Sequence, residues 1–227
     1  MDTSTRTRIA AASLVLGPLL FTVGDVLRRL VEPSGSNLSG TDIVTAIGQH
    51  GPTWLAAGLL ALAAAFFFVV GVTGLIATAS GRGARLTTVG AVMVGVGAIA
   101  SVGHAMGYYF FYAALSTAHT PGPEIDALDG AGSYPMIVVV ILLFIVGLVL
   151  GPIVLFLGLR RARRVPIWAV VAAVAFAVLG NTSGVGAGIL GIVAAMAAFV
   201  PAARSLTRAP TEAPADSIAE APLRQEV

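Results

Sequence analysis

The sequence predicts an all-α protein, a polytopic bundle of six membrane-spanning helices. Composition is the first observation behind this prediction: 57% of the 227 residues are hydrophobic and only 11% are charged, whereas roughly a quarter of residues are charged in an average soluble domain. The second is the mean hydropathy, which is +0.93 over the whole chain. The third is a series of apolar segments about 20 residues long, which is enough to cross a hydrocarbon core about 30 Å thick.

Four apolar segments each have the length of one span. They cover residues 9–27, 54–77, 86–112 and 136–159. The first follows Arg6 and Arg8, as the apolar core of a secretory signal follows its basic region, but it is longer than the usual roughly 7–15 residues of such a core. Because no small-x-small cleavage site follows it, we expect this segment to remain in the protein as the first span.

The last apolar region, 165–200, is too long for one span. A straight helix of its 36 residues would measure about 54 Å, far more than the hydrocarbon core of a bilayer. The run GNTSG at 180–184 is polar and prone to form a turn near the middle of the region. We therefore expect two short spans here, which makes six in all; five spans with one kinked or re-entrant segment is the alternative.

The distribution of arginine favours six spans. All 13 basic residues are Arg. With six spans and the N-terminus in the cytoplasm, eleven of them lie on the cytoplasmic side and only Arg28 and Arg29 lie outside, as the positive-inside rule requires. Five spans would place Arg204, Arg208 and Arg224 outside. The sequence thus predicts a multi-pass membrane protein with both termini in the cytoplasm.

The C-terminal residues differ in composition from the rest of the chain. Residues 204–227 are rich in Ala, Pro and acidic side chains and contain few large apolar ones, which is typical of disordered segments. We therefore expect two regions: a six-span transmembrane bundle over 1–203 and a disordered cytoplasmic tail over 204–227.

A short motif occurs twice. The sequence LVLGP stands at 14–18 and again at 148–152, and each copy is followed six residues after its proline by a glycine, Gly24 and Gly158. The two copies lie three spans apart and therefore run in opposite directions, as in the inverted 3+3 repeats of several transporters. The alternative is a chance match in a sequence that uses few residue types.

Pairs of small residues four positions apart recur along the predicted spans. These pairs are Gly103 and Gly107, Gly147 and Gly151, and Gly184 and Gly188. In lipid, small residues let helix backbones approach each other and pack. The pairs predict close helix packing within the bundle, and the same seams would allow oligomerisation.

Several classes of chemistry are excluded. The chain has no Cys, which rules out disulfides and cysteine-ligated metals, and it lacks phosphate-binding, HExxH and GxSxG motifs. The spacing of its histidines and acidic residues matches no metal-ligand pattern, so we predict neither a metal nor a cofactor.

The basic pI near 9.5 reflects membrane topology, and we predict membrane lipids as partners and no nucleic acid.

Three polar residues lie at one depth. Asp25, His104 and Asn181 each follow the inner end of their span by 16 or 17 positions, which is about 24–25 Å of helix. Ser183 and Tyr108 lie within about a turn of this level. Polar groups inside a membrane are costly and are therefore candidates for function. We expect these residues to converge in a polar pocket that opens to the outside.

We assign roles to these residues as follows. Asp25 and His104 are the candidate catalytic or proton-sharing pair and are expected to face each other, because a carboxylate favours the charged form of a nearby imidazole. Tyr108, Tyr109, Asn181 and Ser183 are the candidate ligand-binding residues.

Structural alternatives exist for the same residues. Asp25 precedes Arg28 by three residues and Arg29 by four, so on a helix it can pair with both at the aqueous interface. His104 can form one hydrogen bond in a packed bundle, and Asn181 can serve the turn alone. The aromatic run at 108–112 is typical of a belt that anchors the end of a span among the lipid headgroups.

The whole chain resembles the small, uncharacterised multi-span membrane proteins of high-GC bacteria. Its Arg-only basic set, its Ala- and Gly-rich spans and its tail of Pro, Ala and Glu carry this resemblance. The resemblance implies a polytopic protein of a bacterial plasma membrane and assigns no functional residue.

Two functional classes fit the sequence, besides an accessory membrane subunit with no site. The first is a bundle that binds or transports a small apolar or amphiphilic molecule through the outward-facing pocket. The second is an intramembrane enzyme acting on a lipid or isoprenoid substrate, which resembles integral-membrane terpene cyclases in size and number of spans. In the enzyme, Asp25 would be the general acid and aromatic ring faces would stabilise carbocations.

Overall fold

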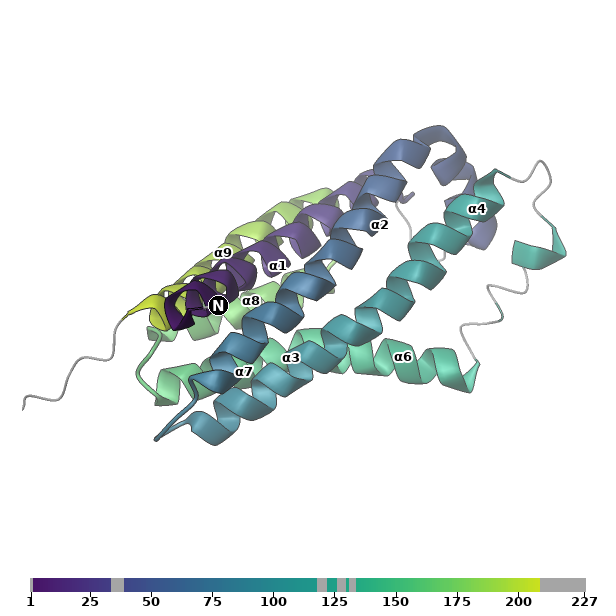
Figure 1. Ribbon diagram of the computed structural model, residues 1–227. Coiled ribbons are helices and arrows are strands. Elements are labelled where there is room, and N and C mark those ends of the chain that lie inside the picture. The colour runs from purple at the N-terminus through teal and green to yellow at the C-terminus, as the bar shows by residue number, and fades with distance from the viewer. Residues whose placement is uncertain (1, 34–38, 118–121, 126–129, 131–133, 209–227) are drawn as a thin grey trace, which may run out of the picture.

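The computed structural model describes residues 2–33, 39–117, 122–125, 130 and 134–208, and Figure 1 shows an elongated bundle of helices. The longer helices are α1 (Thr3–Val31), α2 (Gly40–Ala77), α3 (Ala84–Ala105), α6 (Pro135–Ile145), α7 (Gly151–Arg161), α8 (Ile167–Gly180) and α9 (Val185–Thr207). Two π-helical turns, η1 (Met106–Phe111) and η2 (Val146–Leu150), continue α3 into the short α4 (Tyr112–Ser116) and join α6 to α7. The all-α polytopic bundle is confirmed.

Six helical rods run between the two ends of the bundle. Five have the length and composition of a membrane span, namely 3–31, 40–77, 84–116, 135–161 and 185–207. The sixth, α8, is apolar but has only 14 residues, about 21 Å of helix, which is less than a full hydrocarbon core. The break expected at 180–184 is confirmed: α8 ends at Gly180 and α9 begins at Val185 after Gly184, whose φ of +94° suits glycine.

The rods form a closed ring around an apolar core. Each packs on its neighbours in the order α1, α2, α3, α7, α8, α9 and back to α1. Aromatic edges meet at the centre, where the ring of Phe199 lies 5.1 Å from that of Phe156, 6.0 Å from Phe68 and 6.1 Å from Phe176. Edge-to-face contacts of this kind add to the energy of burial.

Glycines set the spacing between α3 and the continuous segment formed by η2 and α7. A Cβ added at Gly147 would lie 2.3 Å from the Cα of Gly97, and one added at Gly90 would lie 2.2 Å from the backbone nitrogen of Leu155. Gly151 meets the backbone of Val94 in the same way. The predicted seam at Gly147 and Gly151 therefore exists and lies inside the bundle.

The other two predicted glycine pairs play smaller parts. A Cβ at Gly103 would meet only a side-chain atom of Val140 at 3.3 Å, and one at Gly107 would have no neighbour within 4 Å. Gly188 contacts Val26 and the stem of Arg29, whereas Gly184 is open. Of the pair Gly103 and Gly107, only Gly103 thus lies close to another helix.

The two LVLGP copies have similar packing roles with different partners. Gly17, in the first copy, lies against the backbone of Phe68 in α2, whereas Gly151, in the second, lies against α3. An inverted repeat would relate α2 to α8 rather than to α3. The shared motif supplies small residues to two seams, and the proposed duplication stays a prediction.

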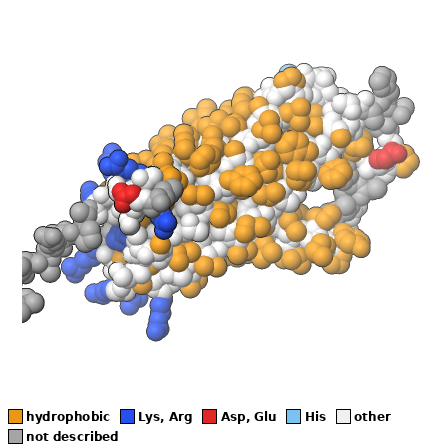
Figure 2. All heavy atoms as spheres, in the orientation of Figure 1, with side chains coloured by type: hydrophobic (Ala, Val, Ile, Leu, Met, Phe, Trp, Pro, Cys, Tyr) orange, Lys and Arg blue, Asp and Glu red, His pale blue; other side chains and the backbone are white. Residues whose placement is uncertain are grey.

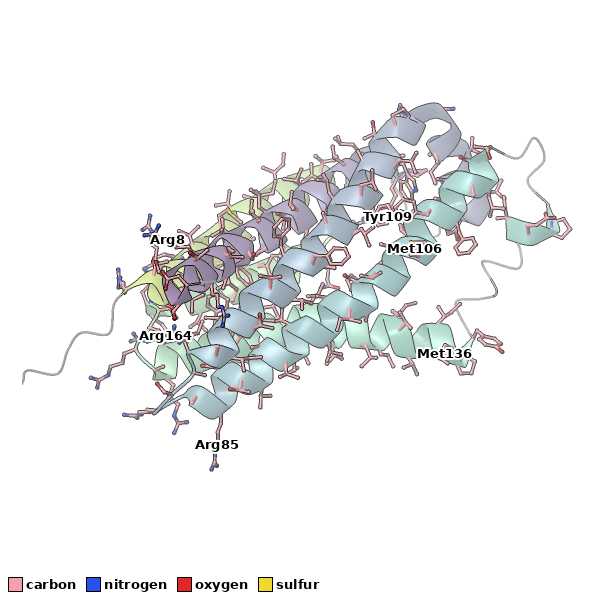
Figure 3. The ribbon with its side chains drawn as sticks, viewed as in Figure 1. Arg8, Arg85, Met106, Tyr109, Met136 and Arg164 are labelled. Carbon is pink, nitrogen blue, oxygen red and sulfur yellow. The ribbon has the colours of Figure 1, made fainter. Side chains whose placement is uncertain are left out.

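Arginines gather at one end of the bundle, which we call the arginine-rich end; the other is the Asp25 end. Figure 2 shows the blue side chains at this end and an orange apolar surface along the flanks, and Figure 3 places Arg8, Arg85 and Arg164 there. Helix α9 continues past the predicted boundary at 203 as far as Thr207, and the side chain of Leu206 is buried. The bundle therefore includes residues 204–207, and residues 209–227 lie outside the described part.

The start of α2 folds over the Asp25 end. Ser39 caps this helix through a reciprocal box with Asp42, and the backbone kinks at His50, two residues before Pro52. The segment before the kink buries Ile43 and Ile47 in a second apolar cluster that also contains Trp54 and Tyr109. Tyr109 belongs both to this cluster and to the lining of the site described next.

Candidate ligand-binding pocket

A cavity of about 230 Å³ lies inside the Asp25 end of the bundle. Four rings line it: Phe21, Tyr108, Tyr109 and Phe144. Four polar side chains share the lining: Asp25, Arg28, Ser101 and His104. Helices α1, α2, α3, α6 and α8 and the turn η1 all contribute, so the cavity exists only in the assembled bundle.

Asp25 is held by two arginines on its own helix. Its Oδ1 accepts hydrogen bonds from Arg28 at 2.7 and 3.1 Å, and its Oδ2 accepts one from Nε of Arg29 at 2.6 Å. The helical spacings of three and four residues bring the guanidinium groups back to the carboxylate. The pairing with Arg28 and Arg29 expected as the alternative is confirmed, but Arg29 is buried rather than in water.

Arg29 joins α1 to the turn between α8 and α9. Its guanidinium donates to the carbonyl oxygens of Leu179 at 3.2 Å, Gly180 at 3.3 Å and Gly184 at 3.0 Å, and also to that of Thr182. The last carbonyls of a helix have no partner within the helix and carry its negative dipole end. A cation therefore satisfies the end of α8, with Asp25 as its counterion.

A second chain of polar contacts links α1 to η1. Arg28 also forms an ion pair with Glu32, and the hydroxyl of Tyr108 donates to the other carboxylate oxygen of Glu32. The path Asp25, Arg28, Glu32, Tyr108 thus runs along the rim of the cavity. It fixes the tyrosine ring against the imidazole of His104.

His104 lies between two rings in a stack. Its ring centroid is 4.8 Å from that of Phe144 and 5.3 Å from that of Tyr108, with interplanar angles of 17° and 12°. In the described part of the chain its imidazole makes no hydrogen bond, and no fully buried side-chain nitrogen or oxygen there lacks a partner. The imidazole nitrogens are therefore not sealed off, and they can bond a guest in the cavity that His104 lines.

The π-helical turn η1 presents the two tyrosines. A π-turn shifts the register of a helix by one residue and is frequent at functional sites. Trp54, which is fully buried, donates its indole N–H to the carbonyl oxygen of Tyr109 at 2.9 Å. A Cβ added at Gly58 would lie 2.7 Å from the Cβ of Tyr109. Trp54 and Gly58 of α2 together hold Tyr109 of η1 against α2, and Figure 3 labels this tyrosine.

The predicted residues divide into two groups. Asp25, His104, Tyr108 and Tyr109 all line the cavity, although no hydrogen bond joins Asp25 to His104 within the described residues. Asn181 and Ser183 are exposed and are absent from the lining, to which their turn contributes only Gly180. The amide of Asn181 donates to the carbonyl oxygen of Ala177 at 2.8 Å, so it serves the end of α8.

The aromatic run 108–112 therefore has two faces. Tyr109 is buried and Tyr108 is half-buried in the pocket, whereas the ring of Phe111 is 59% exposed on the outer surface. Phe111 can serve in the expected aromatic belt. The two tyrosines take part in the pocket.

Sequence reasoning missed several lining residues. The sequence predicts Arg28 as an outside charge and as a pairing partner of Asp25 but not as a pocket residue, and Phe21 and Phe144 are single rings within long apolar runs. The signal for Arg28 was present, because Asp25, Arg28 and Glu32 are spaced three and four apart on one helix face. Nothing in the apolar runs distinguishes the two phenylalanines.

The lining of the cavity has the character of a site for a small organic molecule. No group of three or more metal-ligating side chains occurs among the residues that the structure describes. Aromatic walls, small residues and a few polar side chains are typical of a site for a small organic molecule. No family model, curated protein or solved structure matches this chain.

Proposed function

We propose that this membrane protein binds a small apolar or amphiphilic molecule in the cavity at the Asp25 end. One observation carries the proposal: a cavity of about 230 Å³ is lined by aromatic rings together with a few polar side chains. Such a combination provides apolar contact area and a means of orienting a guest.

The size of the cavity limits the ligand. Apolar cavities of about 150 Å³ in proteins bind benzene, and pockets for drug-sized ligands begin near roughly 300 Å³. A cavity of about 230 Å³ therefore suits a molecule somewhat larger than a benzene ring. A whole lipid does not fit inside it.

The polar side chains of the lining can accommodate one small polar group of the ligand. Both oxygens of Asp25 already accept hydrogen bonds from arginines, so the carboxylate is largely engaged within α1. The imidazole of His104 has no hydrogen bond among the described residues and is the natural partner for a hydroxyl or N–H of the ligand.

Binding is favoured over catalysis by the state of Asp25. A general acid must present its proton to the substrate, but Asp25 is engaged by two guanidinium groups. The enzyme alternative, with aromatic rings stabilising a cation, would need another proton donor. Transport is an extension of binding and requires that the cavity opens to the other side of the membrane.

A substitution that fills the cavity tests the proposal. Ala105 is buried and lines the cavity, whereas Ile99 lies on the exposed surface of the same helix. We expect indole to raise the thermal midpoint of the purified protein in detergent, because a ligand that binds only the native state stabilises it. The increase should persist in I99F and vanish in A105F.

Two further results decide between the functional classes. An equal response of A105F and the parent protein to indole would contradict binding in this cavity. Extracts of cells with and without the gene then separate the classes: redistribution of a compound indicates transport, a new product indicates an enzyme, and no change indicates an accessory subunit.

We further propose that the protein lies in a bacterial plasma membrane with both termini in the cytoplasm. The gathering of arginines at one end supports this orientation. Because the chain has no Cys, single cysteines report topology directly. In intact cells, a membrane-impermeant maleimide should label T41C, at the Asp25 end, and should label S4C and T207C only after permeabilisation. Labelling of T207C in intact cells would contradict the six-span topology.

A further inference from the structure

A second cavity, of about 390 Å³, lies between α8 and α9 at the arginine-rich end. Its lining combines two kinds of side chain. Arg164, Arg204 and Arg208 supply positive charge, and Trp168, Met196 and Val200 supply apolar surface. It lies at the opposite end of the bundle from the pocket described above and shares no residue with it.

The three arginines have no acidic partner within the described residues. Every ion pair found there involves Asp25 or Glu32 at the other end. Arg164 is also held in place, since its guanidinium donates to Oγ1 of Thr78 at 3.2 Å and to the carbonyl oxygen of Ser205 at 3.4 Å. These contacts join the loop before α8 to the ends of α2 and α9, so one cation of the cavity is preorganised.

Polarity changes along the cavity in the direction of α9. Arg204, Val200 and Met196 are spaced four residues apart and therefore lie on one side of the helix, with about 6 Å between successive positions. Arg208 extends this row beyond the end of the span. Trp168, near the start of α8, is 53% exposed. Charge thus lies at the helix ends and apolar surface lies one and two turns deeper.

This order matches that of a phospholipid, whose phosphate lies at the surface and whose acyl chains lie deeper. Arginine binds phosphate oxygens through several N–H groups at once. The first turn of α8 adds backbone N–H groups that no side chain caps. Basic pockets between transmembrane helices bind anionic headgroups.

We propose that this cavity binds one anionic phospholipid, with its phosphate at Arg164, Arg204 and Arg208 and the upper part of an acyl chain along Trp168, Val200 and Met196. The proposal is independent of the ligand at the Asp25 end. It adds a specific lipid site to the general attraction between basic residues and anionic membranes.

The test compares lipids and variants of the full chain purified in a neutral detergent. Native mass spectrometry measures retention of dioleoylphosphatidylglycerol, of dioleoylphosphatidylcholine and of the soluble glycerol 3-phosphate. The site variant is R204Q/R208Q, since both side chains are exposed and their loss leaves the core intact. The matched control is R6Q/R8Q, which removes two exposed charges of the same end outside this cavity.

We expect one molecule of phosphatidylglycerol to bind in preference to phosphatidylcholine. The site variant should bind it about 25-fold more weakly, because each basic residue contributes roughly fivefold at an anionic surface, and the control should bind it as the parent does. Equal losses in both variants would overturn the site in favour of diffuse attraction. Retention of glycerol 3-phosphate as strong as that of the lipid would overturn the role of the apolar side chains Trp168, Met196 and Val200.

Discussion

Replacing Arg29 by methionine is expected to lower the free energy of unfolding by about 3–5 kcal/mol, the cost of breaking a buried ion pair by removing one partner. Arg29 is 8% exposed and holds both Asp25 and the end of α8. Methionine fills a similar volume but leaves the carbonyl oxygens of Gly180, Thr182 and Gly184 without this donor. The midpoint of unfolding in detergent measures the loss.

Two companion variants make the Arg29 result specific. R29K keeps the charge but lacks the planar fork that reaches several carbonyls, so it should fall between R29M and the parent. R8M removes an exposed arginine from the other end and should change the free energy of unfolding by less than about 0.5 kcal/mol. A loss in R29M no larger than that in R8M would show that the contact with the α8–α9 turn contributes nothing to stability.

Replacing Gly147 by leucine is expected to cost about 3 kcal/mol, at the upper end of the usual range for over-packing. The obstacle is the Cα of Gly97 at 2.3 Å from the added Cβ, and a backbone atom cannot move aside as a flexible side chain can. Helix α3 and the turn η2 must therefore separate, which also shifts Phe144, a pocket residue near the end of α6 just before η2. Unfolding midpoints and indole binding report the two effects.

The control for this substitution is G186L. Gly186 lies in α9, where an added Cβ meets nothing within 4 Å, and leucine is a better helix former than glycine. G186L should therefore be as stable as the parent or more so. Equal stability of G147L and G186L would mean that the two helices are not held at the separation described here.

Depth along the membrane could be predicted from the sequence, because every helical residue adds about 1.5 Å. That arithmetic placed Asp25, His104 and the turn at 180–184 at one level, and the structure brings Asp25, His104 and Gly180 to one cavity. Direction around the helix axis could not be predicted in the same way. Asn181 and Ser183 have the right depth but lie on an exposed turn.

Contacts between distant parts of the chain account for the other differences. Trp54 has the position of an interfacial anchor in the sequence, yet it is buried because the carbonyl oxygen of Tyr109, 55 residues away, accepts its N–H. Arg29 has the position of an outside charge, yet the end of α8 lies opposite it. The π-turn at Met106–Phe111 has no sequence signal of its own, and it decides which aromatic rings face the cavity.

The contact between Arg29 and the carbonyl oxygen of Thr182 spans 153 residues, and this separation bears on the order of assembly. During synthesis α1 is complete long before the α8–α9 turn exists, since chains grow from the N-terminus. Throughout that interval α1 itself supplies Arg29 with a counterion, Asp25, which lies one helical turn away on the same helix. Asp25 is thus the first counterion of a cation whose other ligands, the carbonyl oxygens at the α8–α9 turn, are synthesised much later.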